Sequence, residues 1–232
     1  MAVRRVLGAV AITGAVGLGS AGYLWEAGYL GPGDGPERLT VSYGVSEPVR
    51  ELVVEGLTGG IEVLAGDAVR VVEQQSFRGD PPRTRHEVSD GTLRLTYDCS
   101  DCGVGYRVTV PAGTKVRLSS GTGGIRLAGL AGEVRAEAGT GGVTASGLTS
   151  SAVRVSVATG GIDLGFATSP TTVEARADTG GVRVAVPGGE EPYAVDAGAD
   201  TGGVEVTVPR RAGAPRSITA HTGAGGVAVT GG

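Results

Sequence analysis

The chain has 232 residues, of which 44 are glycine and only 4% are aromatic, and its formal net charge is −4. An apolar content of 40% with so small a net charge excludes a disordered chain, because disorder requires low hydrophobicity and high net charge. The arginines alternate with acidic residues and form no basic stripe, so we expect no nucleic-acid partner.

The first thirty residues contain a segment suited to a membrane. Arg4 and Arg5 precede an uncharged run over residues 6–25, which as a helix would extend about 30 Å and cross a bilayer core. We therefore interpret residues 1–30 as a membrane anchor or signal segment and expect contact with the membrane through residues 6–25. The two arginines favour a cytoplasmic N-terminus, hence a single-pass membrane protein with an extracellular C-terminal domain. The alternative is a secreted protein, because Gly19-Ser20-Ala21 offers small residues for signal cleavage.

A glycine- and proline-rich linker over residues 31–37 leads into short alternating runs. Residues 134–138 and 153–157 each alternate apolar with polar or charged side chains, a period of two that is typical of strands with one buried face. No segment beyond the linker has a helical period, so we expect an all-β body. We divide it into N-terminal coils and a cap over residues 38–121, with a disulfide turn, and regular repeat coils over residues 122–232.

Seven threonine-glycine turns punctuate this body. Six read Thr-Gly-Gly-[Ile/Val], and the last is stretched, running from Thr222 to Val227. We interpret these turns as structural corners, because glycine takes positive φ without steric cost. A phosphate-cradling function is disfavoured, since no P-loop lysine and no following helix are present. The predicted structural turn residues are Thr58, Gly59, Gly60, Thr122, Gly123, Gly124, Thr140, Gly141, Gly142, Thr159, Gly160, Gly161, Thr179, Gly180, Gly181, Thr201, Gly202 and Gly203.

The near-constant interval of about twenty residues indicates a repeat architecture in which each unit packs on the next. Two folds fit it: a right-handed single-stranded β-helix or β-solenoid with one coil per unit, preceded by the N-terminal transmembrane or signal helix, or a stack of hairpins in a sandwich or barrel. The β-helix is favoured because equivalent residues then form ladders of alternating charge. The expected ladders are Arg126, Thr144, Asp163, Arg183 and Glu205 on the first strand, and Arg154 then Glu174, and Arg176 then Asp196, on the second. The 64 residues from Thr58 to Thr122 leave room for about three more coils, with one protruding loop over residues 77–87.

Cys99 and Cys102 are the only cysteines and are separated by two residues. Outside the cytoplasm a pair of cysteines is typical of a structural disulfide, here closing a tight turn. A redox or sensing function, metal binding or two free thiols are the alternatives. Asp178 and Asp200 precede two successive turns, so they are candidates for a stacked cation site, although turn aspartates are usually solvated.

No catalytic motif is present, so we expect no catalytic residues, no enzyme activity, no cofactor and no resident metal. The repeated turns and the segment Tyr106-Arg107-Val108-Thr109-Val110-Pro111 resemble the bacterial DUF4097-type putative adhesin family over about residues 38–230. The resemblance implies a single-stranded, right-handed β-helix-like domain at the cell envelope. Our first hypothesis is a non-enzymatic β-solenoid that presents an extracellular surface for adhesion or for an unknown envelope protein or surface ligand. A sensory or regulatory ectodomain in envelope stress or assembly is the alternative, and a carbohydrate-active β-helix enzyme is less favoured.

Overall fold

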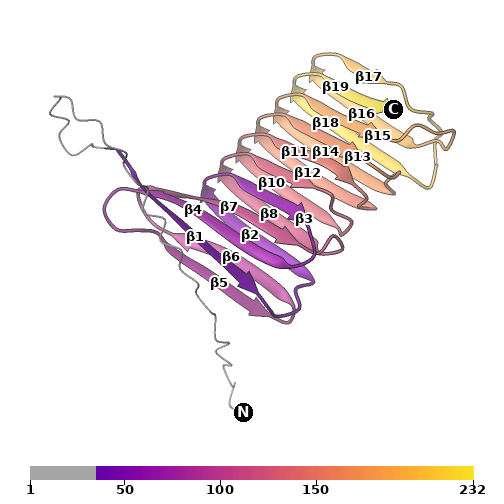
Figure 1. Ribbon diagram of the computed structural model, residues 1–232. Coiled ribbons are helices and arrows are strands. Elements are labelled where there is room, and N and C mark those ends of the chain that lie inside the picture. The colour runs from indigo at the N-terminus through magenta and orange to yellow at the C-terminus, as the bar shows by residue number, and fades with distance from the viewer. Residues whose placement is uncertain (1–34) are drawn as a thin grey trace, which may run out of the picture.

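The computed structural model describes residues 35–232, and every regular element among them is a strand (Figure 1). The strands are β1 (Glu37–Val45), β2 (Glu51–Thr58), β3 (Ile61–Ala65), β4 (Val69–Phe77), β5 (Arg83–Ser89), β6 (Thr92–Asp98), β7 (Cys102–Val110), β8 (Lys115–Thr122), β9 (Ile125–Ala128), β10 (Val134–Thr140), β11 (Val143–Leu148), β12 (Ala152–Thr159), β13 (Ile162–Phe166), β14 (Thr172–Thr179), β15 (Val182–Val186), β16 (Ala194–Thr201), β17 (Val204–Val206), β18 (Ser217–Ala224) and β19 (Val227–Gly231). The predicted all-β body is confirmed. No helix in this part of the chain is long and apolar enough to span a membrane, and the predicted segments at residues 1–30 and 6–25 and most of the linker lie outside the described residues.

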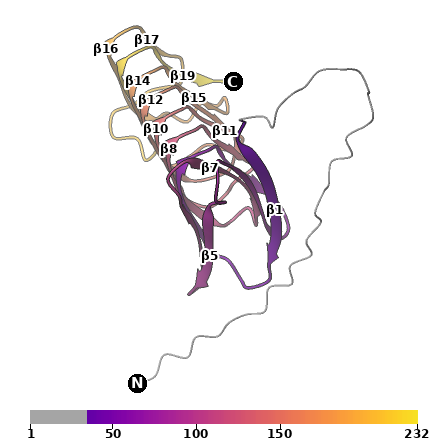
Figure 2. The ribbon, with the colours of Figure 1, turned by 90° about the vertical axis from the view of Figure 1, so that its left-hand side faces the viewer.

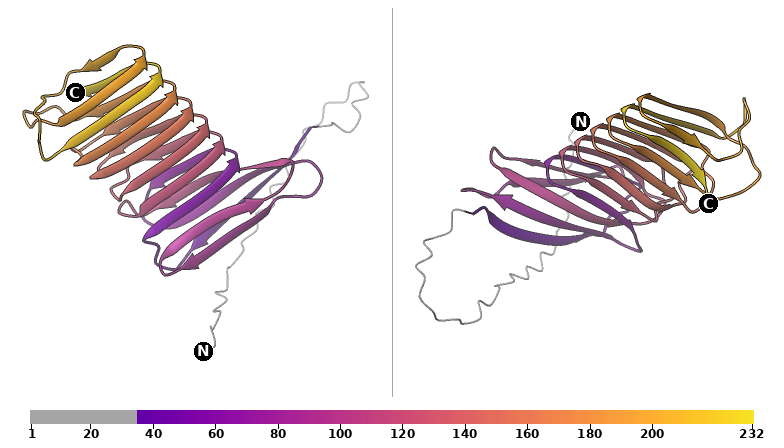
Figure 3. Two further views of the ribbon diagram at one scale, coloured as in Figure 1. Left: turned by 180° about the vertical axis from the view of Figure 1, so that it is seen from behind. Right: turned by 90° about the horizontal axis from the view of Figure 1, so that it is seen from above.

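The strands form two mixed sheets that face each other. Sheet A has the order β1-β4-β7-β3-β9-β11-β13-β15-β19-β17, and sheet B has the order β16-β18-β14-β12-β10-β8-β2-β6-β5. We call a strand of sheet B and the strand of sheet A that follows it a coil. Figure 3 shows these coils side by side in a solenoid-like stack, with their strands running in one direction over most of its length.

The alternation predicted from the sequence decides which side chains enter the core. In β10, Val134, Ala136 and Ala138 are buried between the sheets, whereas Arg135 and Glu137 are exposed. Val134 lies in register with Val116 of β8 and Val153 of β12, so each column of inward side chains continues from coil to coil. Burying one such valine contributes roughly 1.5 to 3 kcal/mol, and the columns together form one continuous core.

The coils do not follow one another in chain order at either end of the stack. The last coil, β18–β19, lies between β14–β15 and β16–β17, so the penultimate coil forms the outer edge. At the other end β2–β3 lies inside β6–β7. The connections that enter β16 and β18 span residues 187–193 and 207–216, which is more than the five residues between β13 and β14. Their length allows the chain to skip one strand position and return.

This exchange overturns part of the predicted charge ladder. Arg154 does lie beside Glu174, and Arg126, Thr144, Asp163 and Arg183 are consecutive neighbours as predicted. The two predicted neighbours in the exchanged region are wrong. Ala228 separates Arg183 from Glu205, and the register places His221 beside Arg176 where Asp196 was expected.

The chain between Thr58 and Thr122 also differs from the three coils that we predicted. It contains one full coil, β6–β7, and two antiparallel additions, in which β4 pairs with β7 and β5 pairs with β6. The reversal occurs at Asp90-Gly91, where both residues have positive φ (52° and 77°), as a two-residue hairpin turn requires. The predicted loop at residues 77–87 is shorter, because β4 ends at Phe77 and β5 begins at Arg83.

Candidate binding surface

The threonine-glycine turns join the two sheets at one corner of every repeat coil. The first glycine of each Gly-Gly pair has φ between 128° and 147°, a conformation that side chains rarely adopt. A Cβ added at Gly160 would lie 2.5 Å from the carbonyl oxygen of Gly141 in the neighbouring coil, and one added at Gly141 would lie 2.5 Å from that of Gly123. These glycines are therefore required twice, by their own backbone conformation and by the close approach of the next coil. They are Gly59, Gly123, Gly141, Gly160, Gly180, Gly202 and Gly225.

The second glycine of each turn has a different environment. None of them has positive φ, and an added Cβ at Gly161 or Gly181 would lie 3.5 Å from the next glycine oxygen, an ordinary contact distance. Gly161 and Gly181 are exposed on the outer side of sheet A. Their missing side chains leave a channel that crosses the strands along the axis of the stack.

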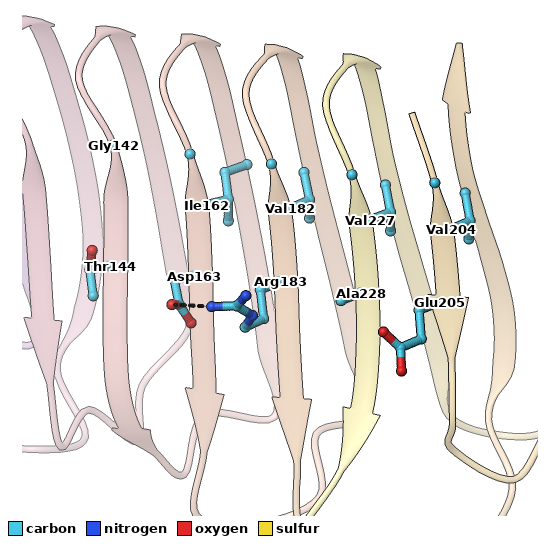
Figure 4. A pocket seen from close by; sticks show the side chains of 14 residues that line it. Gly142, Thr144, Ile162, Asp163, Val182, Arg183, Val204, Glu205, Val227 and Ala228 are labelled. Atoms are coloured by element: carbon cyan, nitrogen blue, oxygen red, sulfur yellow. Dashed lines mark ion pairs between the residues drawn. The ribbon is translucent and has the colours of Figure 1, made fainter. Parts of the chain in front are cut away.

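This channel is the glycine groove, an open depression of about 790 Å³ on the outer face of sheet A. It extends over β11, β13, β15, β19 and β17, and no aromatic side chain lines it. Figure 4 shows the side chains along one side in the order Thr144, Asp163, Arg183, Ala228 and Glu205. Asp163 and Arg183 form an ion pair at 3.6 Å. The carboxylate of Glu205 is the third charged group of the groove and takes no part in this ion pair. Five strands at about 4.8 Å spacing give the groove a length of about 19 Å.

An exposed column of threonines runs beside the glycine groove at the same corner. Thr58, Thr122, Thr140, Thr159 and Thr179 lie in register on successive strands of sheet B. The column then breaks, because Ala224 occupies the next position and Thr201 follows it at the edge.

Thr222 does not open the last turn as we predicted. It lies in register with Ala177 and Ala199, its side chain is buried, and its hydroxyl donates to the carbonyl oxygen of Gly180 at 2.7 Å. Because this turn has two extra residues, Thr222 lies two positions earlier along its strand than the other threonines do, at a position whose side chain is buried.

Asp178 and Asp200, the candidates for a stacked cation site, do not lie on adjacent strands. Gly223 lies between them, since the register aligns Thr179 and Thr201 with Ala224 on either side of β18. Two strand spacings of about 4.8 Å place the aspartates too far apart to share one cation. Among residues 35–232, no three His, Cys, Asp or Glu side chains gather where they could hold a metal ion.

The outer face of sheet B carries ion pairs across and along its strands. Glu174 accepts from Arg154 at 2.6 Å and from Arg176 at 3.1 Å. The hydrogen bond from Arg154 lowers the pKa of the Glu174 carboxyl below its ordinary value, and Arg176 lowers it further. At the exchanged end, the imidazole of His221 lies 3.1 Å from the carboxylate of Asp196. Each exposed pair contributes little to stability, but together they give this face alternating charge.

Cys99, just after β6, and Cys102, the first residue of β7, lie at disulfide-bonding distance, with Cα atoms 6.0 Å apart. The turn that they close lies beside an open depression of about 440 Å³, which is also lined by charged residues of the β4–β5 connection. Nothing around the pair resembles a thioredoxin-type site, since the described chain on both sides of it is strand.

Sequence reasoning missed a polar cluster inside the N-terminal end of the stack. Glu73 on β4 is only 1% exposed, and its carboxylate accepts from the Tyr43 hydroxyl at 2.8 Å and from the Gln75 amide at 3.1 Å. Burial raises the pKa of Tyr43 far above its ordinary value, and the charge of Glu73 raises it further, so the hydroxyl remains a donor. The hydroxyl of Tyr106 is buried nearby without a partner among the described residues. The sequence did carry a signal for this cluster. Glu73 and Gln75 occupy the same alternating positions of β4 as Val69 and Val71, whose side chains are buried.

No protein-family model and no curated protein sequence matches this chain. The solved structures that match this chain include two bacterial proteins. A putative cell adhesion protein from Clostridium sporogenes ATCC 15579 superposes with a TM-score of 0.52 at 15% sequence identity, over 84% of this chain and 98% of that chain. A putative adhesin from Bacteroides fragilis NCTC 9343 gives a TM-score of 0.51 at 14% identity, over 84% of this chain and 97% of that chain. At this level of identity the chain shares a fold with bacterial proteins that are named putative adhesins.

Proposed function

We propose that this protein is a non-enzymatic β-solenoid of the bacterial cell envelope that binds a partner through the glycine groove on the outer face of sheet A. The groove is the observation that carries the proposal. It combines a depression, main-chain groups left exposed by glycine, and charged side chains at its border. The similarly folded proteins named putative adhesins support an adhesive function.

The chemistry of the groove favours a polypeptide partner. Sugar-binding platforms rely on aromatic ring faces, and the groove lining contains none. A groove of about 19 Å fits roughly six residues of extended chain at about 3.3 Å per residue. A basic residue of the partner would meet Glu205 at the edge strand, where no arginine lies beside it in the register.

The proposed location follows from the sequence and not from the fold. The uncharged run at residues 6–25, preceded by Arg4 and Arg5, would anchor the solenoid and place its body outside the cytoplasm. In that arrangement the groove is presented at the cell surface.

Filling the groove tests the proposal. The substitutions Gly161→Leu and Gly181→Leu add side chains where a Cβ meets only ordinary contacts, so the fold should persist. Ser156→Leu and Ala158→Leu add the same bulk on the exposed face of β12 in sheet B and serve as the matched control. The full chain, displayed on beads, would be assayed for adhesion to whole bacterial cells and to immobilised extracellular matrix proteins.

We expect the groove variants to lose at least tenfold in bead retention, while the control variants retain full adhesion. Loss in the sheet B variants alone would place the adhesive surface on the opposite face. Turnover of an envelope polysaccharide by the unmodified chain would contradict the non-enzymatic proposal.

A further inference from the structure

The two sheets end unevenly at the N-terminal end of the stack. Beyond the coil β6–β7, sheet A continues through β4 to β1, whereas sheet B continues only through β5. The position beside β5 in sheet B, opposite β1, is filled by no described residue. We call it the vacant strand position. Figure 2 shows β1 and β5 lying apart at this end, with the rest of the stack behind them.

Side chains that face the vacant strand position are less buried than their counterparts deeper in the stack. Leu39 on the inner face of β1 is 44% exposed, and Val41 and Tyr43 are half-buried. On β5, His86 is exposed, and its ring stacks on Tyr43 at 4.6 Å between centroids. Apolar and aromatic surface is thus left open on the side of sheet A that a further strand of sheet B would cover.

The free edge of β5 offers main-chain hydrogen bonds. The two-residue turn at Asp90-Gly91 makes Ser89 and Thr92 a hydrogen-bonded pair, so alternate residues of β5 direct their N–H groups to β6. The N–H groups of the residues between them, which include Thr84 and His86, point to the vacant strand position. A strand placed there would therefore pair with β5 without disturbing the β5–β6 ladder.

The side chains on the outer face of β5 determine which charge a neighbouring strand should carry. Arg85 lies opposite Thr96 in the ladder, and no ion pair in the described part of the chain involves Arg85 or Arg83. Glu87, the one acid among the outer side chains of β5, lies opposite Arg94, which itself pairs with Glu55, and Arg83 lies opposite Asp98 of β6. A strand with acidic residues on its outer face and apolar residues on its inner face would complement both surfaces.

A second copy of this chain does not fit the vacant strand position. Its free end strand β16 is joined to β17 by a two-residue turn at Gly202-Gly203, so β16 beside β5 would bring β17 into the place of β1. Antiparallel pairing of β5 with β5 of a second copy would bring that copy's β4 into the same place. Only a single strand without a second sheet can enter.

We propose that the edge of β5 is a β-augmentation site, which takes one extended acidic peptide segment of a partner protein into the vacant strand position, with Arg83 and Arg85 selecting its charge. In such sites main-chain hydrogen bonds supply affinity and alternate side chains supply specificity. This site lies at the opposite end of the stack from the glycine groove, so either proposal can fail without the other.

The test uses the full chain and two fluorescein-labelled probes, a seven-residue peptide of alternating valine and aspartate and its counterpart of alternating valine and lysine. Binding is followed by fluorescence anisotropy. We expect the aspartate peptide to bind at least tenfold more tightly than the lysine peptide, and Arg85→Glu to reverse that preference. Arg183→Glu, at the glycine groove, is the matched charge control and should leave the preference unchanged.

A second pair of variants isolates the main-chain contact. His86→Pro removes a donor that faces the vacant strand position and leaves the β5–β6 ladder intact, whereas His86→Ala retains the donor. With folding checked by circular dichroism, we expect His86→Pro to weaken binding of the aspartate peptide at least tenfold relative to His86→Ala. Equal binding by these two variants would overturn the proposal.

Other outcomes would overturn it as well. If neither peptide binds, the arginines only guard the edge against unwanted pairing, or another segment of the chain already occupies the position. A dimer in sedimentation experiments that Arg85→Glu dissociates would assign the edge to a second copy.

Discussion

The two glycines of one turn should respond oppositely to the same substitution. In Gly160→Ala, the alanine would need φ of 143°, and its Cβ would lie 2.5 Å from the carbonyl oxygen of Gly141 and 2.6 Å from its carbonyl carbon. A non-glycine residue held in such a conformation costs of order 1 to 3 kcal/mol, and the contact with rigid backbone adds to that cost. We therefore expect a loss of about 3 kcal/mol in the free energy of unfolding.

Gly161→Ala is the matched control, one residue away. Its φ is not positive and its added Cβ lies 3.5 Å from the Gly181 oxygen, so the native structure accommodates it. Because alanine restricts the unfolded chain more than glycine does, this variant should be unchanged or stabilised by up to about 1 kcal/mol.

Urea unfolding followed by far-ultraviolet circular dichroism measures both effects. The free energy of unfolding falls by about 2 kcal/mol per molar urea. Gly160→Ala should therefore lower the urea concentration at the unfolding midpoint by about 1.5 M, whereas Gly161→Ala should not lower it. Equal losses in the two variants, or a loss below about 0.5 kcal/mol at Gly160, would refute the assignment of distinct functions to the two glycines.

Two further predictions concern hydrogen-bonded carboxylates. Tyr43→Phe removes one of the two donors to the buried Glu73 carboxylate and should destabilise the protein by about 1 to 3 kcal/mol in the same urea assay, and an unchanged midpoint would contradict this. Because Arg154 lowers the pKa of Glu174, the stability from this pair is present above the ordinary pKa of glutamate and is lost as pH falls through the lowered one. Arg154→Gln should raise the Glu174 pKa measured by carboxyl NMR titration, and an unchanged titration would show that the ion pair does not form in solution.

Local pattern predicted the repeating part of the fold well. The alternation at residues 134–138 and 153–157 identifies strands whose inward side chains are buried, and it identifies Arg154 and Glu174 as neighbours. Such predictions succeed because period two determines which face of a strand is buried, whatever lies beside it. Two further local signals were present but not used. The Asp90-Gly91 dipeptide is typical of a hairpin turn, and Glu73 occupies a position of β4 that the alternation assigns to the core.

The order of the strands could not be predicted in the same way. A strand that moves by one position in a parallel stack meets the same kind of apolar inner face, so the pattern of β18 does not distinguish the edge from the interior. The observed strand order changes which residues are neighbours on the candidate binding surface. Ala228 rather than Glu205 borders Arg183, and Gly223 separates Asp178 from Asp200. The stretched turn after Thr222 was visible in the sequence, but its effect on register was not.

Both the glycine groove and its charge pattern depend on the placement of β19 between β15 and β17. Disulfide cross-linking tests that placement directly, in a chain whose native cysteines are replaced by serine. Cysteines at Arg183 and Ala228 would lie on adjacent strands at about 4.8 Å, within the range for a disulfide, whereas cysteines at Arg183 and Glu205 would lie about twice as far apart. The exchanged order predicts a cross-linked peptide, detected by mass spectrometry, for the first pair and none for the second. A cross-link between positions 183 and 205, with none between 183 and 228, would show that the coils stack in chain order and would contradict the structure on which the proposed binding surface rests.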